Sequence, residues 1–159
     1  MRRPWAFAVV AVTLLLASGC AQTREESMAA SVTVADQWVS AADMGMAAMF
    51  GTLRNAGARE ARILSGSSPA AGRIEVHEVV PDVGGSNVMQ PKAGGIAIPA
   101  DGAHDLTPGG DHVMLMDLVG PLRPGTDVEV VLTFEDGSTL PVTAQARDFP
   151  GADEEYQHG

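Results

Sequence analysis

The sequence is poor in the residue types on which many enzymes and nucleic-acid-binding proteins depend. It has a single cysteine, Cys20, a single lysine, Lys92, and four histidines, while acidic residues outnumber basic ones by 20 to 10. An exported domain with one cysteine cannot be held by an internal disulfide, so its stability has to come from its hydrophobic core. A formal charge of -10 argues against nucleic-acid binding, which requires basic patches.

Catalytic signatures are also absent from the sequence. It contains no Gly-rich phosphate loop with a lysine, no G-x-S-x-G nucleophile elbow and no H-E-x-x-H motif, and its carboxylates form no identifiable pair. A blue-copper electron-transfer centre of the usual type is excluded as well, because it requires a cysteine thiolate. We therefore expect a binding or carrier protein and not an enzyme.

The N-terminus has the pattern of a secretory signal. Arg2 and Arg3 precede an apolar run over residues 5–17, which is shorter than the about 20 residues that a membrane-spanning helix needs. The run ends in Leu16-Ala17-Ser18-Gly19-Cys20, which resembles a bacterial lipobox and implies cleavage before a lipid-bearing Cys20. We expect a bacterial extracytoplasmic protein anchored to a membrane of the cell envelope. An ordinary signal peptide, with Cys20 placed there by chance, is the alternative.

The chain after the lipobox is expected to hold one folded domain. We predict a signal peptide over residues 1–19, a flexible tether over 20–30, the domain over 31–149 and an acidic mobile tail over 150–159. Within the domain, short segments alternate apolar and polar residues and are separated by turn signals. This pattern favours an all-β sandwich or barrel.

Several segments show the alternation clearly. We expect strands near residues 32–36, 46–53, 60–65, 74–77, 96–98, 112–116, 128–134 and 140–146, with the second and third of these paired as a hairpin. Trp38 is expected to anchor the core. Met44, Met46 and Met49 are expected to fill it, although their spacing also occurs in methionine-rich copper sequences. His104 lies among turn residues and is expected to be exposed.

Four side chains of metal-ligand type stand out, namely His77, Met89, His112 and Met114. Strand alternation puts His112 and Met114 on one face with their Cα atoms about 6.5–7 Å apart, because each residue rises about 3.3 Å. Soft sulfur favours Cu(I), and imidazole suits copper in either oxidation state. If the four converge, we expect a shallow, exposed site for one copper ion, with freedom at Met89 on a loop. Taken singly, each residue is more often structural.

Two further residues are auxiliary candidates. Met116 shares a face with Met114 and is expected either as a reserve ligand or as a partly buried residue at the rim. His158, in the tail, is expected at most to bind Cu(II) weakly. Thioethers bind metal at any pH, but an imidazole has to be neutral, so copper affinity should fall below about pH 6.5.

Several segments together resemble the periplasmic copper chaperones of the PCuAC family. They lie within residues 32–146 and include Val76-His77-Glu78, Met89-Gln90-Pro91, residues 94–99 and residues 106–115. The resemblance implies a cupredoxin-like Greek-key β-sandwich of about 7–9 short strands. It also implies one bound Cu(I) with His77, Met89, His112 and Met114 as its ligands. The loop before Met89 departs from the family by one extra residue, at Gly84-Gly85.

The resemblance further implies a metallochaperone that delivers copper to the CuA centre of cytochrome c oxidase, often together with a Sco-type chaperone. Two alternatives stay open. A metal-free envelope β-sandwich for adhesion or scaffolding would bind no copper and would present a large apolar patch to a partner. A cupredoxin-like redox protein would bind Cu(II), but without an intense blue absorption band, since the domain offers no thiolate.

Overall fold

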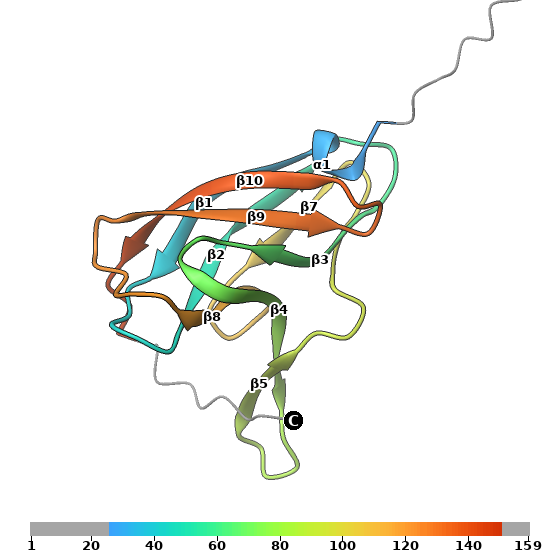
Figure 1. The fold of residues 1–159 in the computed structure, drawn as a ribbon. Coiled ribbons are helices and arrows are strands. Elements are labelled where there is room, and N and C mark those ends of the chain that lie inside the picture. Colours follow the sequence, from blue (N-terminus) through green and yellow to red (C-terminus); the bar gives the residue numbers. More distant parts are fainter. Residues whose placement is uncertain (1–25, 151–159) are drawn as a thin grey trace, which may run out of the picture.

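Apolar residues recur at every second position along most segments, and in the computed structural model this alternation folds the described residues, 26–150, into a β-sandwich (Figure 1). One helical turn, α1 (Met28–Ser31), precedes the strands. The strands are β1 (Val32–Ser40), β2 (Met46–Asn55), β3 (Ala61–Ser67), β4 (Ala71–Pro81), β5 (Asn87–Pro91), β6 (Ile96–Ile98), β7 (Gly102–Leu106), β8 (His112–Leu118), β9 (Asp127–Phe134) and β10 (Thr139–Arg147). The all-β prediction is confirmed, with ten strands where 7–9 were expected.

The strands are hydrogen-bonded in the order β5-β4-β8-β2-β1-β10-β9-β3-β6, with β7 beside β2. The pair β1–β10 is parallel, and the pairs β4–β8, β2–β8 and β4–β5 are antiparallel. Figure 1 shows β9 and β10 in front of β2, while the hairpin of β4 and β5 projects from one end. Strand β1 joins the two layers, because it pairs with β2 and, through Trp38–Ser40, with β10. The site described below lies on β2, β4, β5 and β8, near the base of this hairpin.

The space between the layers is filled by aliphatic side chains. Val39, Leu53, Ile63 and Leu132 have no exposed surface. Trp38, which was expected in the core, is only half-buried, and its ring packs on Phe50 with centroids 4.7 Å apart. The prediction for Trp38 is therefore wrong in position, since this aromatic residue lies at the end of the sandwich near the site.

The predicted hairpin between β2 and β3 is wrong. Strand β3 pairs with β9, β6 and β4, and not with β2. The chain crosses between layers after Asn55, whose buried amide donates to Arg59 O (2.7 Å) and Ile98 O (3.2 Å) and accepts from Gly57 N (2.9 Å). These bonds fix a wide arch where a tight turn was expected.

The predicted tether ends earlier than expected, because α1 is attached to the sandwich. Met28 N donates to Asp136 Oδ2 (2.8 Å) and Ala29 N donates to Ser138 Oγ (3.0 Å). The Ser138 hydroxyl is the largest cause that holds the pKa of Asp136 below its ordinary value, and the Met28 backbone hydrogen bond lowers this pKa further. The signal peptide, Cys20 and His158 lie outside the described residues. No helix within residues 26–150 is long and apolar enough to cross a membrane.

The placement of β3 predicts a contrast between two neighbouring residues. Ile63 is fully buried, whereas Leu64 is 43% exposed. Ile63→Ala should lower the free energy of unfolding by about 2–5 kcal/mol, because it leaves a cavity between the layers, and Leu64→Ala by less than about 1 kcal/mol. Urea denaturation of the metal-free protein measures both values. Equal losses would contradict the assignment of β3 to the second layer.

Candidate metal centre

Strands β4 and β8 bring the two candidate histidines together. Their antiparallel register places His77 directly opposite His112 and Glu75 opposite Met114. The two imidazole centroids are 5.9 Å apart, and the side chains are 0% and 2% exposed. Successive side chains alternate between the two faces of a strand, so these four residues share one face of the strand pair.

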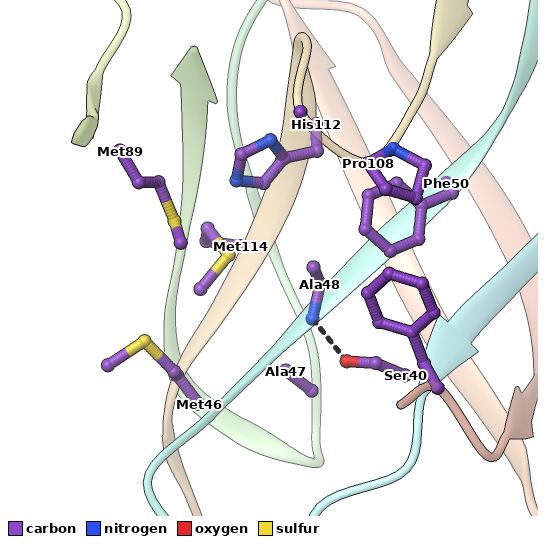
Figure 2. Close-up of a pocket in the computed structure, with 11 residues that line it drawn as sticks. Ser40, Met46, Ala47, Ala48, Phe50, Met89, Pro108, His112 and Met114 are labelled. Atoms are coloured by element: carbon purple, nitrogen blue, oxygen red, sulfur yellow. Dashed lines mark hydrogen bonds between the residues drawn. The ribbon is translucent and has the colours of Figure 1, made fainter. Parts of the chain in front are cut away.

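Met89 was expected on a loop, but it reaches the same region from strand β5. It lies opposite Val79 on β4, is 8% exposed and packs in a cluster with Met114 and Met116. Met89, His112 and Met114 line one pocket, and Figure 2 shows their side chains around the same space. The structure thus gathers three of the four predicted ligands around this pocket, and His77 adjoins it through its contact with the ring of His112.

The site is buried, which contradicts the expected shallow and exposed arrangement. Every one of the four predicted ligands is at most 8% exposed. Phe50, Phe149 and Pro108 also line the pocket. The Phe50 ring lies 6.0 Å from the ring of His112 and 5.8 Å from that of Phe149. These aromatic residues were not predicted, because nothing in their local sequence indicates that they meet.

A hydrogen bond orients each imidazole. His112 Nδ1 donates to Gly110 O (2.8 Å), and His77 Nε2 donates to Glu75 Oε2 (2.8 Å). A carbonyl oxygen and an ionised carboxylate can only accept, so the lone pair of each neutral ring lies on the opposite nitrogen. Those nitrogens are His112 Nε2 and His77 Nδ1, and both are buried. Such a second partner, which fixes the ring and its tautomer, is typical of metal-binding histidines.

Glu75 is kept ionised by its surroundings. The hydrogen bond with His77 is the largest cause that lowers the pKa of Glu75, and a hydrogen bond from Arg73 Nε (2.8 Å) lowers it further, against the opposing effect of burial. Arg73 also pairs with Asp117 at 3.0 Å. An ionised Glu75 would offset part of the positive charge of a bound cation, and its hydrogen bond fixes the orientation of the His77 ring.

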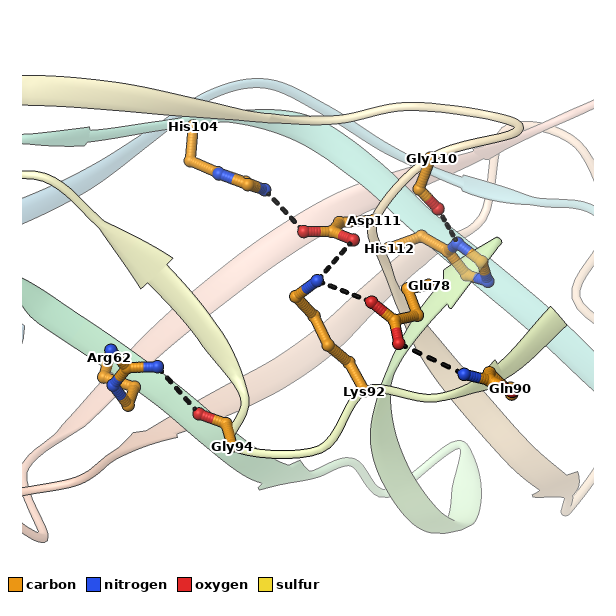
Figure 3. Close-up of polar contacts among 9 residues, drawn as sticks. All are labelled: Arg62, Glu78, Gln90, Lys92, Gly94, His104, Gly110, Asp111 and His112. Carbon is orange, nitrogen blue, oxygen red and sulfur yellow. Dashed lines mark hydrogen bonds and ion pairs between the residues drawn. The ribbon is translucent and has the colours of Figure 1, made fainter. Parts of the chain in front are cut away.

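The residues that adjoin His77 and His112 in the sequence, Glu78 and Asp111, form a polar network (Figure 3). Lys92 Nζ contacts Glu78 Oε2 at 2.7 Å and Asp111 Oδ1 at 3.2 Å. Gln90 Nε2 donates to Glu78 Oε1 (3.2 Å), and His104 Nε2 lies 2.9 Å from Asp111 Oδ2. His104 was expected to be exposed, but it is half-buried on β7, a strand that was not predicted. The network joins β4, β5, β7 and Asp111, which directly precedes β8, so it ties together the three strands that carry the predicted ligands.

The remaining methionines divide between the core, the pocket and the surface. Met116 is 3% exposed, so it is buried and not at a rim. Met49 fills the core as predicted, whereas Met44 is 81% exposed and the prediction for it is wrong. Met46 is half-buried and lines the pocket. Ser40, also in the pocket wall, accepts a hydrogen bond from Ala48 N (2.9 Å).

The donor set points to a soft cation. Within residues 26–150, no three His, Cys, Asp or Glu side chains gather as a metal site. The pocket instead combines neutral imidazole nitrogen with thioether sulfur, a set that suits Cu(I) and lacks the oxygen ligands that Mg²⁺ and Ca²⁺ prefer. The residues therefore fit a single monovalent copper ion.

Comparisons with known proteins agree with this fold. A family model described as "Putative lipoprotein LpqE-like" matches residues 32–146. The protein named "Putative lipoprotein Lxx21020" of Leifsonia xyli subsp. xyli is 41% identical over 154 residues, which cover 93% of this chain and 92% of the relative. The match to the family model spans the same residues as the resemblance found in the sequence.

Two solved structures are also similar. A copper-bound PCuAC domain from PmoF2 has a TM-score of 0.61 at 19% identity and covers 75% of this chain and 94% of its own. The solution structure of CuI-DR1885 from Deinococcus radiodurans has a TM-score of 0.53 at 28% identity and covers 74% of this chain and 80% of its own. The PmoF2 likeness confirms the predicted cupredoxin-like fold of a PCuAC domain.

The Lys92 network predicts a pH-dependent contribution to stability. The Lys92 hydrogen bond is the largest cause that holds the pKa of Glu78 below its ordinary 4.5, so the stabilisation is present above that value and is lost as the pH falls through the lower folded-state pKa. At pH 7, Lys92→Gln should cost about 1–2 kcal/mol of unfolding free energy. Urea denaturation from pH 7 to pH 3 should show the difference from the parent shrinking with acidification.

Arg54→Gln is the matched control, because it removes one positive charge from an exposed position of β2. It should change the unfolding free energy by less than about 0.5 kcal/mol at either pH. A Lys92→Gln variant as stable as Arg54→Gln at pH 7 would contradict the stabilising role of the Lys92 network.

Proposed function

The chain belongs to the LpqE-like family, and from that premise we propose that it is an extracytoplasmic metallochaperone that binds one Cu(I) through His77, Met89, His112 and Met114. The single observation that carries the proposal is that one histidine and two buried methionines line the same pocket, while the second histidine, His77, lies opposite His112 across β4 and β8. Two of the similar solved structures are copper-bound forms, which supports copper as the cargo.

The chemistry of the donor set suits a carrier. Two imidazoles and two thioethers are neutral, so the bound ion keeps its single positive charge, which Glu75 partly offsets. A thiolate site would hold copper more tightly, whereas neutral donors can be displaced one at a time by the ligands of an acceptor. The copper stays Cu(I) throughout, because the transfer exchanges ligands and moves no electron.

The envelope location and the recipient are parts of the same proposal. A lipid on Cys20 would hold the domain at a membrane, and the lipobox-like sequence together with the lipoprotein name of the Leifsonia relative supports this. The recipient we propose is the CuA centre of cytochrome c oxidase, with a Sco-type chaperone as a partner. The resemblance of residues 76–115 to PCuAC chaperones supports that choice.

The ligand assignment is tested by anaerobic Cu(I) titration against a chromogenic chelator. Cys20→Ser is introduced into every sample, because a free thiol would compete for the ion. The parent should bind one equivalent, and the double variant His112→Ala with Met114→Leu should bind at least about 100-fold more weakly, since it loses one donor of each kind. Met44→Leu should behave like the parent, since Met44 is 81% exposed and does not line the pocket. Equal affinity of the parent and the double variant would refute the site.

Glu75 provides a second test, which separates orientation from ligation. Glu75→Gln keeps the size of the side chain but removes the charge that faces His77 Nε2. The variant should still bind one equivalent of Cu(I), with about 10- to 100-fold lower affinity. Nitrogen-15 NMR of the metal-free parent should show the proton on Nε2 of His77 and on Nδ1 of His112. Unchanged affinity together with the opposite tautomers would contradict this role of Glu75.

A further inference from the structure

Met46 places a third thioether in the pocket, from a strand that carries none of the four proposed ligands. It is the first residue of β2 and lines the pocket together with Met89, His112 and Met114. It also packs against the buried cluster of Met89, Met114 and Met116, and Figure 2 shows its sulfur on the same side of the pocket as those of Met89 and Met114. The ligand set implied by the family resemblance does not include it.

The register of β2 and β8 explains how Met46 reaches the cluster. Met46 lies opposite Met116, and Ala48 lies opposite Met114. Positions two residues apart face the same side, so Met46 and Ala48 share the face that carries both β8 methionines. Ala48 is small and leaves space beside Met114, and Met46 is therefore the β2 side chain that can reach a metal there.

Burial distinguishes Met46 from the other thioethers. Met114, Met116 and Met89 are 2%, 3% and 8% exposed, whereas Met46 is half-buried. Met46 thus has one side toward the cluster and one toward solvent. The unbranched side chain of Met46 has three rotatable bonds. Met46 directly follows Gly45, which has a φ of 81° at the end of the connection from β1. The sulfur can therefore change position without a change in the sandwich.

We propose that Met46 is a transit ligand, which binds Cu(I) at the open side of the pocket while the ion enters and leaves. This inference rests on the proposed function of the site. On entry, a Cu–S bond to Met46 forms as a bond to the outside donor breaks, and a bond to a buried ligand then replaces the bond to Met46. On exit, the same exchanges run in reverse. The copper remains Cu(I), and no proton is transferred, because a thioether carries none.

A transit ligand differs from a resident ligand and from a packing residue in what its loss changes. Without Met46, both loading and release should slow while the affinity stays close to that of the parent. Loss of a resident ligand would lower the affinity and speed release, and loss of a packing residue would change neither rate. Met46→Leu is the suitable variant, because it nearly conserves volume and removes the sulfur.

The rates are measured by stopped flow on the full chain in detergent with Cys20→Ser. Loading starts from a Cu(I)–bicinchoninate complex, and release is followed with excess bathocuproine disulfonate. Met46→Leu should be about tenfold slower in both directions, with an equilibrium affinity within about threefold of the parent. Met44→Leu, two residues away and outside the pocket, should match the parent in all three quantities.

Methyl NMR of carbon-13-labelled methionine gives an independent readout on the parent protein. Sub-stoichiometric Cu(I) should broaden or shift the Met46 methyl signal along with those of Met89 and Met114, and leave that of Met44 in place. An unmoved Met46 signal with unchanged rates in Met46→Leu would overturn the inference, as would faster release from that variant. A parent that binds no Cu(I) would instead overturn the proposed function itself, so the two failures are distinguishable.

Discussion

The candidate metal centre depends above all on the register between β4 and β8. That register sets His77 opposite His112 and Glu75 opposite Met114, so both imidazoles, one thioether and the orienting carboxylate share a face. If β4 slipped by one residue against β8, His77 and Glu75 would turn to the opposite face and would no longer meet His112 and Met114. Val76 and Val113, paired between these positions and 5% and 0% exposed, resist such a slip because they would leave the core.

The two faces of the β4–β8 pair carry different parts of the site. One face carries the proposed neutral donors, which would leave a bound ion exchangeable. The residues next to the histidines in sequence, Glu78 and Asp111, instead meet Lys92 in a charged network that ties β5 and β8 to β4. The only lysine of a strongly acidic chain thus lies where the strands that carry the proposed ligands meet. Firm strands and displaceable ligands are what a carrier needs, since the ion has to leave without unfolding the protein.

Much of the fold and of the candidate site could be predicted from local sequence pattern. The features that could not be predicted depend on contacts between residues distant in the sequence. Alternation in residues 112–116 was enough to place His112 and Met114 on one face, and the fold class followed from repeated short strands. The crossing of β3 into the second layer could not be read in this way, because it depends on Asn55 bonds to Arg59 and to the distant Ile98. The burial of the site and the presence of Met46 in it were missed for the same reason, since β2, β5 and the Phe149 region meet only in the folded chain.

The proposed coordination of the resident ion, by two imidazole nitrogens and two thioether sulfurs, can be measured directly. X-ray absorption at the copper edge, on the Cys20→Ser protein loaded with one equivalent of Cu(I), reads that shell. The proposed coordination predicts a mixed shell of nitrogen and sulfur that loses sulfur in Met114→Leu and nitrogen in His112→Ala. A shell of nitrogen and oxygen alone, unchanged in both variants, would contradict it.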